Sequence, residues 1–162
     1  KNLKIMARLK KLTTILAIII TSISISQNAY SHCEIPCGIY GDSVRIALIK
    51  EHISTIEKSM KMINDISKES SPNYNQLVRW VNNTEEHAKK IQEIVSQYFL
   101  HQRIKLTDPS DKLKYDKYVK QLTLLHQLTV YSMKAKQSTD MSYIEKLRDT
   151  VAAFEKSYFH TH

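Results

Sequence analysis

Residues 45–63 read RIALIKEHISTIEKSMKMI, and their apolar side chains recur in alternating steps of three and four residues. The repeating positions are Ile46, Ile49, Ile53, Ile56, Met60 and Ile63. This spacing puts them all on one face of an α-helix, and it is typical of helices that pack against other helices. The stretch therefore predicts a long amphipathic helix whose apolar face needs partners elsewhere in the chain.

Three later stretches repeat the pattern, over residues 77–98, 115–129 and 144–158, and the third is the loosest. The 162 residues include just two glycines and three prolines, so few positions break a helix. Short connections between long amphipathic helices favour antiparallel neighbours. The sequence predicts an all-α protein, with an antiparallel up-down four-helix bundle over residues 42–162.

Each of the four stretches is preceded by residues that commonly cap helices. A side-chain oxygen at the N-cap accepts a hydrogen bond from a free backbone N–H of the first turn. The expected starts are Asp42 or Ser43, Ser71 before Pro72, Asp108 before Pro109, and a capping box of Ser142 with Glu145.

The histidines of the predicted helices show no cluster in the sequence. His52, His87, His101 and His126 each stand alone on a helix face by spacing. A di-iron site in a four-helix bundle needs paired Glu-x-x-His motifs, and no glutamate here has a histidine three residues later. We therefore interpret these four histidines as surface or core residues.

Residues 1–31 have the three parts of a secretory signal. A basic part around Arg8 is followed by an apolar part over residues 12–25, and small side chains flank a cleavage site at residues 29–31. The apolar part is shorter than the roughly 20 residues of a membrane-spanning helix, although an uncleaved N-terminal anchor is the alternative. We expect a signal peptidase or another protease to remove the segment and the protein to be exported, to the periplasm or outside the cell.

The net charge of +8 is concentrated in that segment. It holds five of the 24 basic residues and none of the 16 acidic ones, which leaves +3 for residues 32–162. A charge this small, spread over helices of mixed sign, argues against a nucleic-acid partner. No later stretch is apolar enough to predict a membrane partner after processing.

Residues 32–41, HCEIPCGIYG, carry the chemistry of the chain, and we call them the hook. They contain both cysteines, four residues apart, with Pro36 stiffening the span and Gly38 permitting a sharp turn. A disulfide is one interpretation, but a bridge this short closes little chain and stabilises little. A zinc site is another, but zinc prefers four side-chain ligands and the hook offers two cysteines and one histidine.

Cleavage after Ser31 would change the donor set, because it turns the His32 nitrogen into a free amine. That amine, the Cys33 amide nitrogen and the thiolates of Cys33 and Cys37 supply two nitrogens and two sulfurs. A square-planar set of this kind suits Ni(II) or Cu(II), and the His32 imidazole can reach an axial position.

At these residues the sequence resembles the nickel superoxide dismutase family, whose mature chains begin His-Cys-x-x-Pro-Cys-Gly-x-Tyr. The matching positions are His32, Cys33, Pro36, Cys37, Gly38 and Tyr40. Later in the chain, the pair Tyr98-Phe99 is a weaker similarity to the family. The family fold is a four-helix bundle, so we expect the resemblance to extend over residues 32–162.

The resemblance implies one nickel ion per chain and assigns a role to each matched residue. His32 would supply its amine and imidazole, Cys33 its amide nitrogen and thiolate, and Cys37 the second thiolate. Tyr40 would stand over the open face of the metal without binding it. In some members a carboxylate of the first helix holds the axial imidazole; Glu51 is the nearest candidate, and the count of residues leaves its role open. The family also implies a hexamer.

The expected activity is dismutation of superoxide to oxygen and hydrogen peroxide by Ni(II)/Ni(III) cycling, with Tyr40 and His32 as the catalytic residues. The alternative is an exported, non-enzymatic helical protein, such as a nickel or copper chaperone or sensor. A plain helical adaptor with a small disulfide is a third interpretation. Tyr40, together with Pro36 and Gly38, favours the enzyme, because a carrier needs thiols but not this whole frame.

Overall fold

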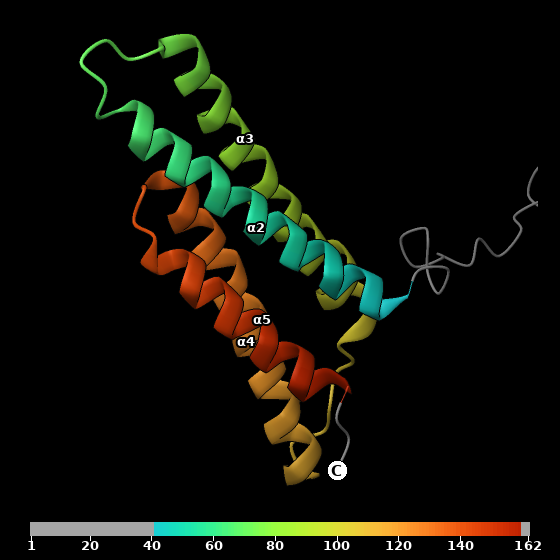
Figure 1. Ribbon diagram of the computed structural model, residues 1–162. Coiled ribbons are helices and arrows are strands. Elements are labelled where there is room, and N and C mark those ends of the chain that lie inside the picture. The colour runs from blue at the N-terminus through green and yellow to red at the C-terminus, as the bar shows by residue number, and fades with distance from the viewer. Residues whose placement is uncertain (1–40, 160–162) are drawn as a thin grey trace, which may run out of the picture. The chain divides into compact units, whose positions relative to one another are not determined.

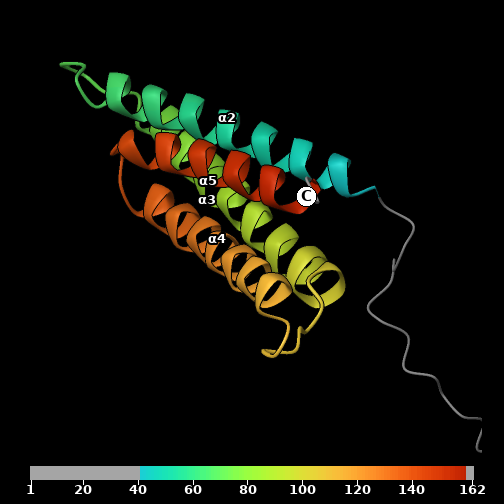
Figure 2. The ribbon, with the colours of Figure 1, turned by 90° about the horizontal axis from the view of Figure 1, so that it is seen from below.

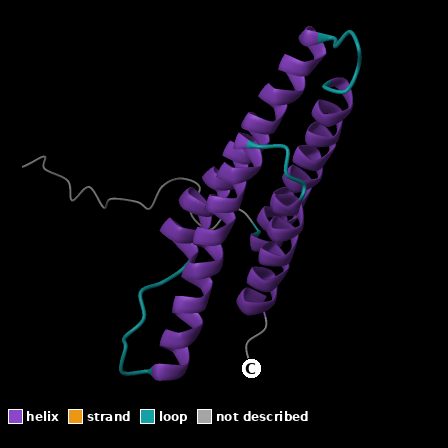
Figure 3. Cartoon of the chain, turned by 90° about the vertical axis from the view of Figure 1, so that its left-hand side faces the viewer, coloured by secondary structure: helices purple, strands orange, loops and turns teal. Residues whose placement is uncertain are grey.

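The structure is a computed structural model, and it describes residues 41–159. Figures 1 and 3 show that these residues form helices joined by loops, with no strand in the described range. The elements are α2 (Asp42–Ile66), α3 (Tyr74–Glu93), η1 (Ile94–Arg103), α4 (Lys112–Gln137) and α5 (Ser142–Phe159). In this part of the chain no helix is both long and apolar enough to cross a membrane.

The helices pack in the order of an up-down bundle. Helix α2 contacts α3 and α5, and α4 contacts the same two helices from the other side. Figures 1 and 2 show α2 with α3 and α4 with α5 as two hairpins lying against each other. The predicted all-α four-helix bundle is confirmed.

The predicted apolar faces of α2 and α5 form the centre of the core. Ile46, Ile49, Ile53, Ile56 and Met60 are buried from α2, and Ile144, Leu147, Val151 and Phe154 from α5. The prediction for the second stretch is wrong at Val81, which is 41% exposed. At that level Asn83 faces α2 and donates a hydrogen bond to the Ser59 Oγ, 2.8 Å away, so the inward face of α3 is polar there.

Two predicted helix starts lie a few residues too early. Helix α3 is capped by Asn73, whose side chain accepts a hydrogen bond from the Gln76 N–H, and α4 is capped by Asp111. Asp108 instead accepts a hydrogen bond from the Ser110 N–H, 2.8 Å away, in the loop. The prolines therefore lie in the loops before these helices, and the next Asn or Asp along the chain caps the first turn.

The other two starts also differ from the expected caps. Gly41 precedes α2 without a side-chain cap, and the Asp42 carboxylate turns to other partners, described below. Ser142 is already the first residue of α5, and its N–H donates to the Asp140 carboxylate at 2.9 Å. The Asp140 side chain, two residues earlier, thus accepts a hydrogen bond from the first turn of α5, which was the role predicted for Ser142.

The end of the second stretch, from Ile94, and the residues that follow it to Arg103 form the π-helical segment η1. The Ile104 N–H donates to the Phe99 carbonyl, five residues back, at 2.9 Å. A π-helix is a wider coil, and it is found often at functional sites. Because residues five apart become neighbours in it, η1 brings Tyr98 and Arg103 side by side.

Candidate metal centre and its support

The residues predicted to form the metal centre fall on a part of the chain that the structure does not describe. His32, Cys33, Cys37 and Tyr40 lie outside residues 41–159, so their roles stay predictions. The structure describes the other side of the junction, where Gly41 in extended backbone leads into Asp42, the first residue of α2. Within the described residues, the side chains that hold the start of α2 are the ones nearest to the hook along the chain.

Asp42 is the centre of a polar cluster made by three elements. The Tyr98 hydroxyl of η1 donates to the Asp42 Oδ1 at 2.5 Å, and the Tyr158 hydroxyl of α5 donates to the Oδ2 at 2.8 Å. The Arg103 Nε of η1 lies 2.9 Å from the Oδ1, and its Nη2 donates to the Tyr98 hydroxyl at 2.9 Å. We call these four residues the Asp42 cluster.

The charges in the Asp42 cluster are matched. Burial by itself would raise the pKa of Asp42, but hydrogen bonds from Tyr98 and Tyr158 and the Arg103 guanidinium outweigh it and lower the pKa. Burial and the adjacent carboxylate raise the pKa of both tyrosines. The carboxylate is therefore ionised and both hydroxyls are protonated near neutral pH, as the hydrogen bonds require.

Aromatic rings surround this cluster on its inner side. The Phe99 ring packs edge-to-face against Tyr98, Phe154 and Tyr158, with centroid distances of 5.2, 4.9 and 5.6 Å. The Arg103 guanidinium carbon also lies 4.8 Å from the centroid of the Tyr98 ring. Edge-to-face and cation–π contacts of this kind restrict the orientation of each ring. The tyrosine hydroxyls are thus presented to Asp42 from a packed layer.

The Asp42 cluster ties the first residue of α2 to η1 and to α5. Gly41 and the preceding residues therefore continue from a backbone position that is held by three side chains rather than from a fraying helix end. The chain predicted to bind metal is attached directly to this fixed point.

Sequence reasoning missed most of this cluster. It expected Asp42 as a cap, included Tyr158 only as the end of the amphipathic stretch 144–158, and did not single out Arg103. Tyr98 did carry a signal, because the Tyr98-Phe99 pair is part of the resemblance. The proximity of Tyr98 and Arg103 depends on the π-helical turn, which the three-and-four spacing of the apolar residues does not indicate.

The histidines give a second correction. His52 of α2 and His87 of α3 do not stand alone, because their Nδ1 atoms lie 3.0 Å apart. Spacing along each helix could not show this, because the contact depends on how the two helices face each other. His126 is exposed on α4, in agreement with its interpretation as a surface residue.

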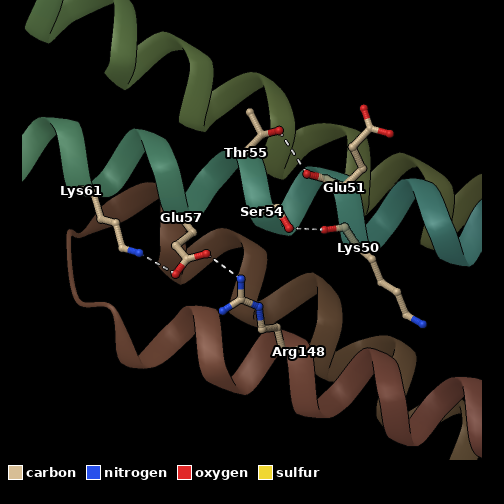
Figure 4. A network of polar contacts seen from close by, with 7 residues as sticks. All are labelled: Lys50, Glu51, Ser54, Thr55, Glu57, Lys61 and Arg148. Carbon is tan, nitrogen blue, oxygen red and sulfur yellow. Dashed lines mark hydrogen bonds and ion pairs between the residues drawn. The ribbon is translucent and has the colours of Figure 1, made fainter.

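Glu51, the open candidate for holding the axial imidazole, is exposed on α2. It lies nine residues beyond Asp42, which is about 14 Å along a helix. In Figure 4 its side chain extends from α2 on a different side from Lys50, which pairs with Glu155 of α5. Its relation to His32 lies outside the described residues.

The donor chemistry of the hook fits nickel. Two thiolates, an amide nitrogen, an imidazole and, after the predicted cleavage at Ser31, a free amine are ligands that suit a square-planar or tetragonal metal. Within residues 41–159, no group of three or more histidine, cysteine, aspartate or glutamate side chains is arranged to hold a metal ion.

Comparison with known proteins gave one match. A family model described as nickel-containing superoxide dismutase matches residues 27–162. The match includes the whole hook, the described helices and the last five residues of the predicted signal segment. No curated protein and no solved structure matched the chain.

Proposed function

Because the chain belongs to the nickel-containing superoxide dismutase family, we propose that its nickel site is the hook, formed after cleavage between Ser31 and His32. The protein is an oxidoreductase that acts on superoxide, and nickel is its cofactor. The match over residues 27–162 carries the function, and the donor set of the hook supports this location for the metal.

We assign the ligands by the chemistry of each residue. His32 would supply its terminal amine and its imidazole. Cys33 would supply its amide nitrogen and thiolate, and Cys37 the second thiolate. The Tyr40 ring would limit access to the metal, and its hydroxyl would order water or substrate.

When bound, nickel supplies one-electron chemistry between Ni(II) and Ni(III), by which one superoxide is oxidised to oxygen and a second is reduced, with two protons, to hydrogen peroxide. The thiolates and the amide nitrogen would donate electron density, which would favour the higher oxidation state and so lower the potential into the range of superoxide. The ligands that the chain supplies would therefore set the redox potential on which catalysis depends.

The Asp42 cluster is the support for this site. The hook has no regular secondary structure by prediction, and small displacements of reacting groups can cost about 100-fold in rate. Holding Asp42 by Tyr98, Tyr158 and Arg103 fixes the end of the hook that joins the bundle. We therefore assign these residues a positioning role.

Two further features belong to the proposal. The signal segment leads to export, and removal of that segment creates the amine ligand, so export and activation use the same cleavage. By family resemblance, the mature chain assembles as a hexamer.

The experiment that tests the hook compares chains beginning at Ser31, His32 and Cys33, each loaded with nickel. We expect superoxide decay to be rapid for the chain that begins at His32 and near background for the others. An extra Ser31 would move the amine away, and loss of His32 would remove the imidazole. Equal activity of the chain beginning at Ser31 would show that the amine is not a ligand.

Two controls make this result specific. Circular dichroism should show the same helix content for all three chains, because the core lies in residues 41–159. Cys33→Ser and Cys37→Ser, made in the chain beginning at His32, should lose activity and nickel while remaining helical. Elemental analysis should find about one nickel per active chain, and active protein with zinc alone would contradict the proposal.

A further inference from the structure

His52 and His87 form a pair of imidazoles between α2 and α3. Their Nδ1 atoms are 3.0 Å apart, and the rings are nearly perpendicular, with centroids 4.9 Å apart. The His52 side chain is buried, and His87 is half-buried at the edge of the contact between the helices. Each residue sits inside a long helix, so the backbone holds the two rings together.

The distance between the two nitrogens suits one metal ion as well as it suits a hydrogen bond. Metal–imidazole bonds of about 2.0–2.1 Å at angles near 90–110° separate two ligand nitrogens by about 2.8–3.4 Å. In the metal-free pair, one Nδ1–H donates to the other Nδ1. If both rings carry their hydrogen on Nε2 instead, both Nδ1 lone pairs are free to bind a metal, and no proton leaves the neutral pair.

Charged groups of both signs lie near the pair. Glu51 and Glu86 each act electrostatically on both histidines, and the nearby positive group is Lys90. The Lys90 ammonium is 2.6 Å from the Glu86 carboxylate, so the three groups together carry one net negative charge, although Lys90 has the larger effect on each imidazole. Burial first, and then the neighbouring positive charges, lower the pKa of both histidines, so neutral rings are available near pH 7.

We propose that His52 and His87 bind a borderline divalent cation, such as Zn²⁺, Cu²⁺ or Ni²⁺, through their two Nδ1 atoms. Imidazole suits these metals, and water fills the remaining positions because the described residues supply no third protein ligand there. The pair shares no residue with the hook, and His52 lies ten residues, about 15 Å, along α2 from Asp42.

The test is a Zn²⁺ titration of the mature, nickel-loaded enzyme, in which the hook is already occupied. Calorimetry should show one further zinc site per chain. Nitrogen-15 spectra of the histidine rings, recorded on the dithionite-reduced protein, should show shifts at the Nδ1 atoms of both His52 and His87. Unchanged signals from these two rings at saturating zinc would overturn the proposal.

Variants separate this pair from other histidines. His52→Asn and His87→Asn should each weaken zinc binding about tenfold or more, since loss of even a supporting group in a metal site costs about 10–100-fold. His126→Asn, on an exposed position of α4, is the matched control and should bind zinc as the wild type does. Because His52 is more buried, His52→Asn could misfold. His87→Asn tests the same site at a less buried position.

Two further outcomes would decide against the site. Loss of the extra zinc in His160→Asn/His162→Asn would assign it to the C-terminal histidines and overturn the proposal, as would wild-type affinity in both pair variants. Superoxide dismutation should be the same in all these proteins. The result on zinc is therefore independent of the proposed function of the hook.

Discussion

Helix α2 carries two carboxylates that are held by cations and yet differ in what surrounds them. Asp42 at its start has a side chain 29% exposed, and Glu57, four turns later, has one 21% exposed. Asp42 is bonded to two tyrosine hydroxyls and one arginine from η1 and α5. Glu57 contacts Lys61 at 2.9 Å and Arg148 at 2.5 Å, as Figure 4 shows, and the side chains of those partners are 60% and 49% exposed.

The exposed fractions of the Asp42 and Glu57 side chains are therefore similar. The two sites differ in how deeply the partners of each carboxylate are buried. Tyr98 is 5% exposed, so its hydroxyl has little access to water if the carboxylate is removed. Lys61 and Arg148 would simply be solvated. An unsatisfied buried group costs free energy, whereas an exposed ion pair contributes little, so the Asp42 cluster should govern both stability and activity.

The largest effect should follow from Asp42→Ala. This change leaves the two tyrosine hydroxyls and Arg103 without their shared partner, and we expect a loss of about 2–3 kcal/mol in the free energy of unfolding. Activity should fall by about tenfold or more, because the end of the hook is no longer held. Chemical denaturation and superoxide decay measure the two effects. Full activity in a nickel-loaded Asp42→Ala protein would refute the positioning role.

A smaller effect is expected for Arg103→Lys. Lysine keeps the positive charge but cannot contact the Asp42 Oδ1 and the Tyr98 hydroxyl together through a planar guanidinium. We expect a loss of about 1 kcal/mol, with activity between that of the wild type and Asp42→Ala. Arg148→Lys is the matched control, and an equal loss in both variants would remove the distinction between the two sites.

The stability of the protein at acid pH should show that the Asp42 cluster acts through the charge of its carboxylate. Partners in the folded state lower the pKa of both Asp42 and Glu57. Their stabilisation is therefore present above the unfolded pKa, about 4, and is lost as pH falls through the lower folded value. The difference in unfolding free energy between wild type and Asp42→Ala should shrink from pH 6 to pH 2.5. If the difference in unfolding free energy did not change with pH, the charge of the Asp42 carboxylate would not be the source of the stabilisation.

The smallest effect is expected for Glu57→Ala. Its two ion pairs lie with solvent-exposed cations, and pairs of this kind contribute up to about 1 kcal/mol. Activity and nickel content should equal those of the wild type, and the small stability difference should vanish in 1 M salt, where charges are screened. A loss as large as that of Asp42→Ala would show that the burial of the partners is not the deciding factor.

The sequence predicted the helices because the fold depends on periodicity. The apolar positions of residues 45–63 and 144–158 predicted the buried faces of α2 and α5 from spacing alone. The starts were less predictable, since Asn73 and Asp111 cap helices that Ser71 and Asp108 were expected to begin. Each loop contains several residues that could cap a helix. The residue that does so depends on where the packed helix begins.

By itself, the sequence determined the four amphipathic helices and the order of donors in the hook, because both depend on residues that are neighbours along the chain. The tertiary structure alone decided which side chains meet across helices: Asp42 with Tyr98, Arg103 and Tyr158, and His52 with His87. Such contacts depend on the rotation and register of one helix against another, and on the π-helical turn of η1. Many pairings are compatible with the same apolar spacing, and close packing of the whole core selects one of them.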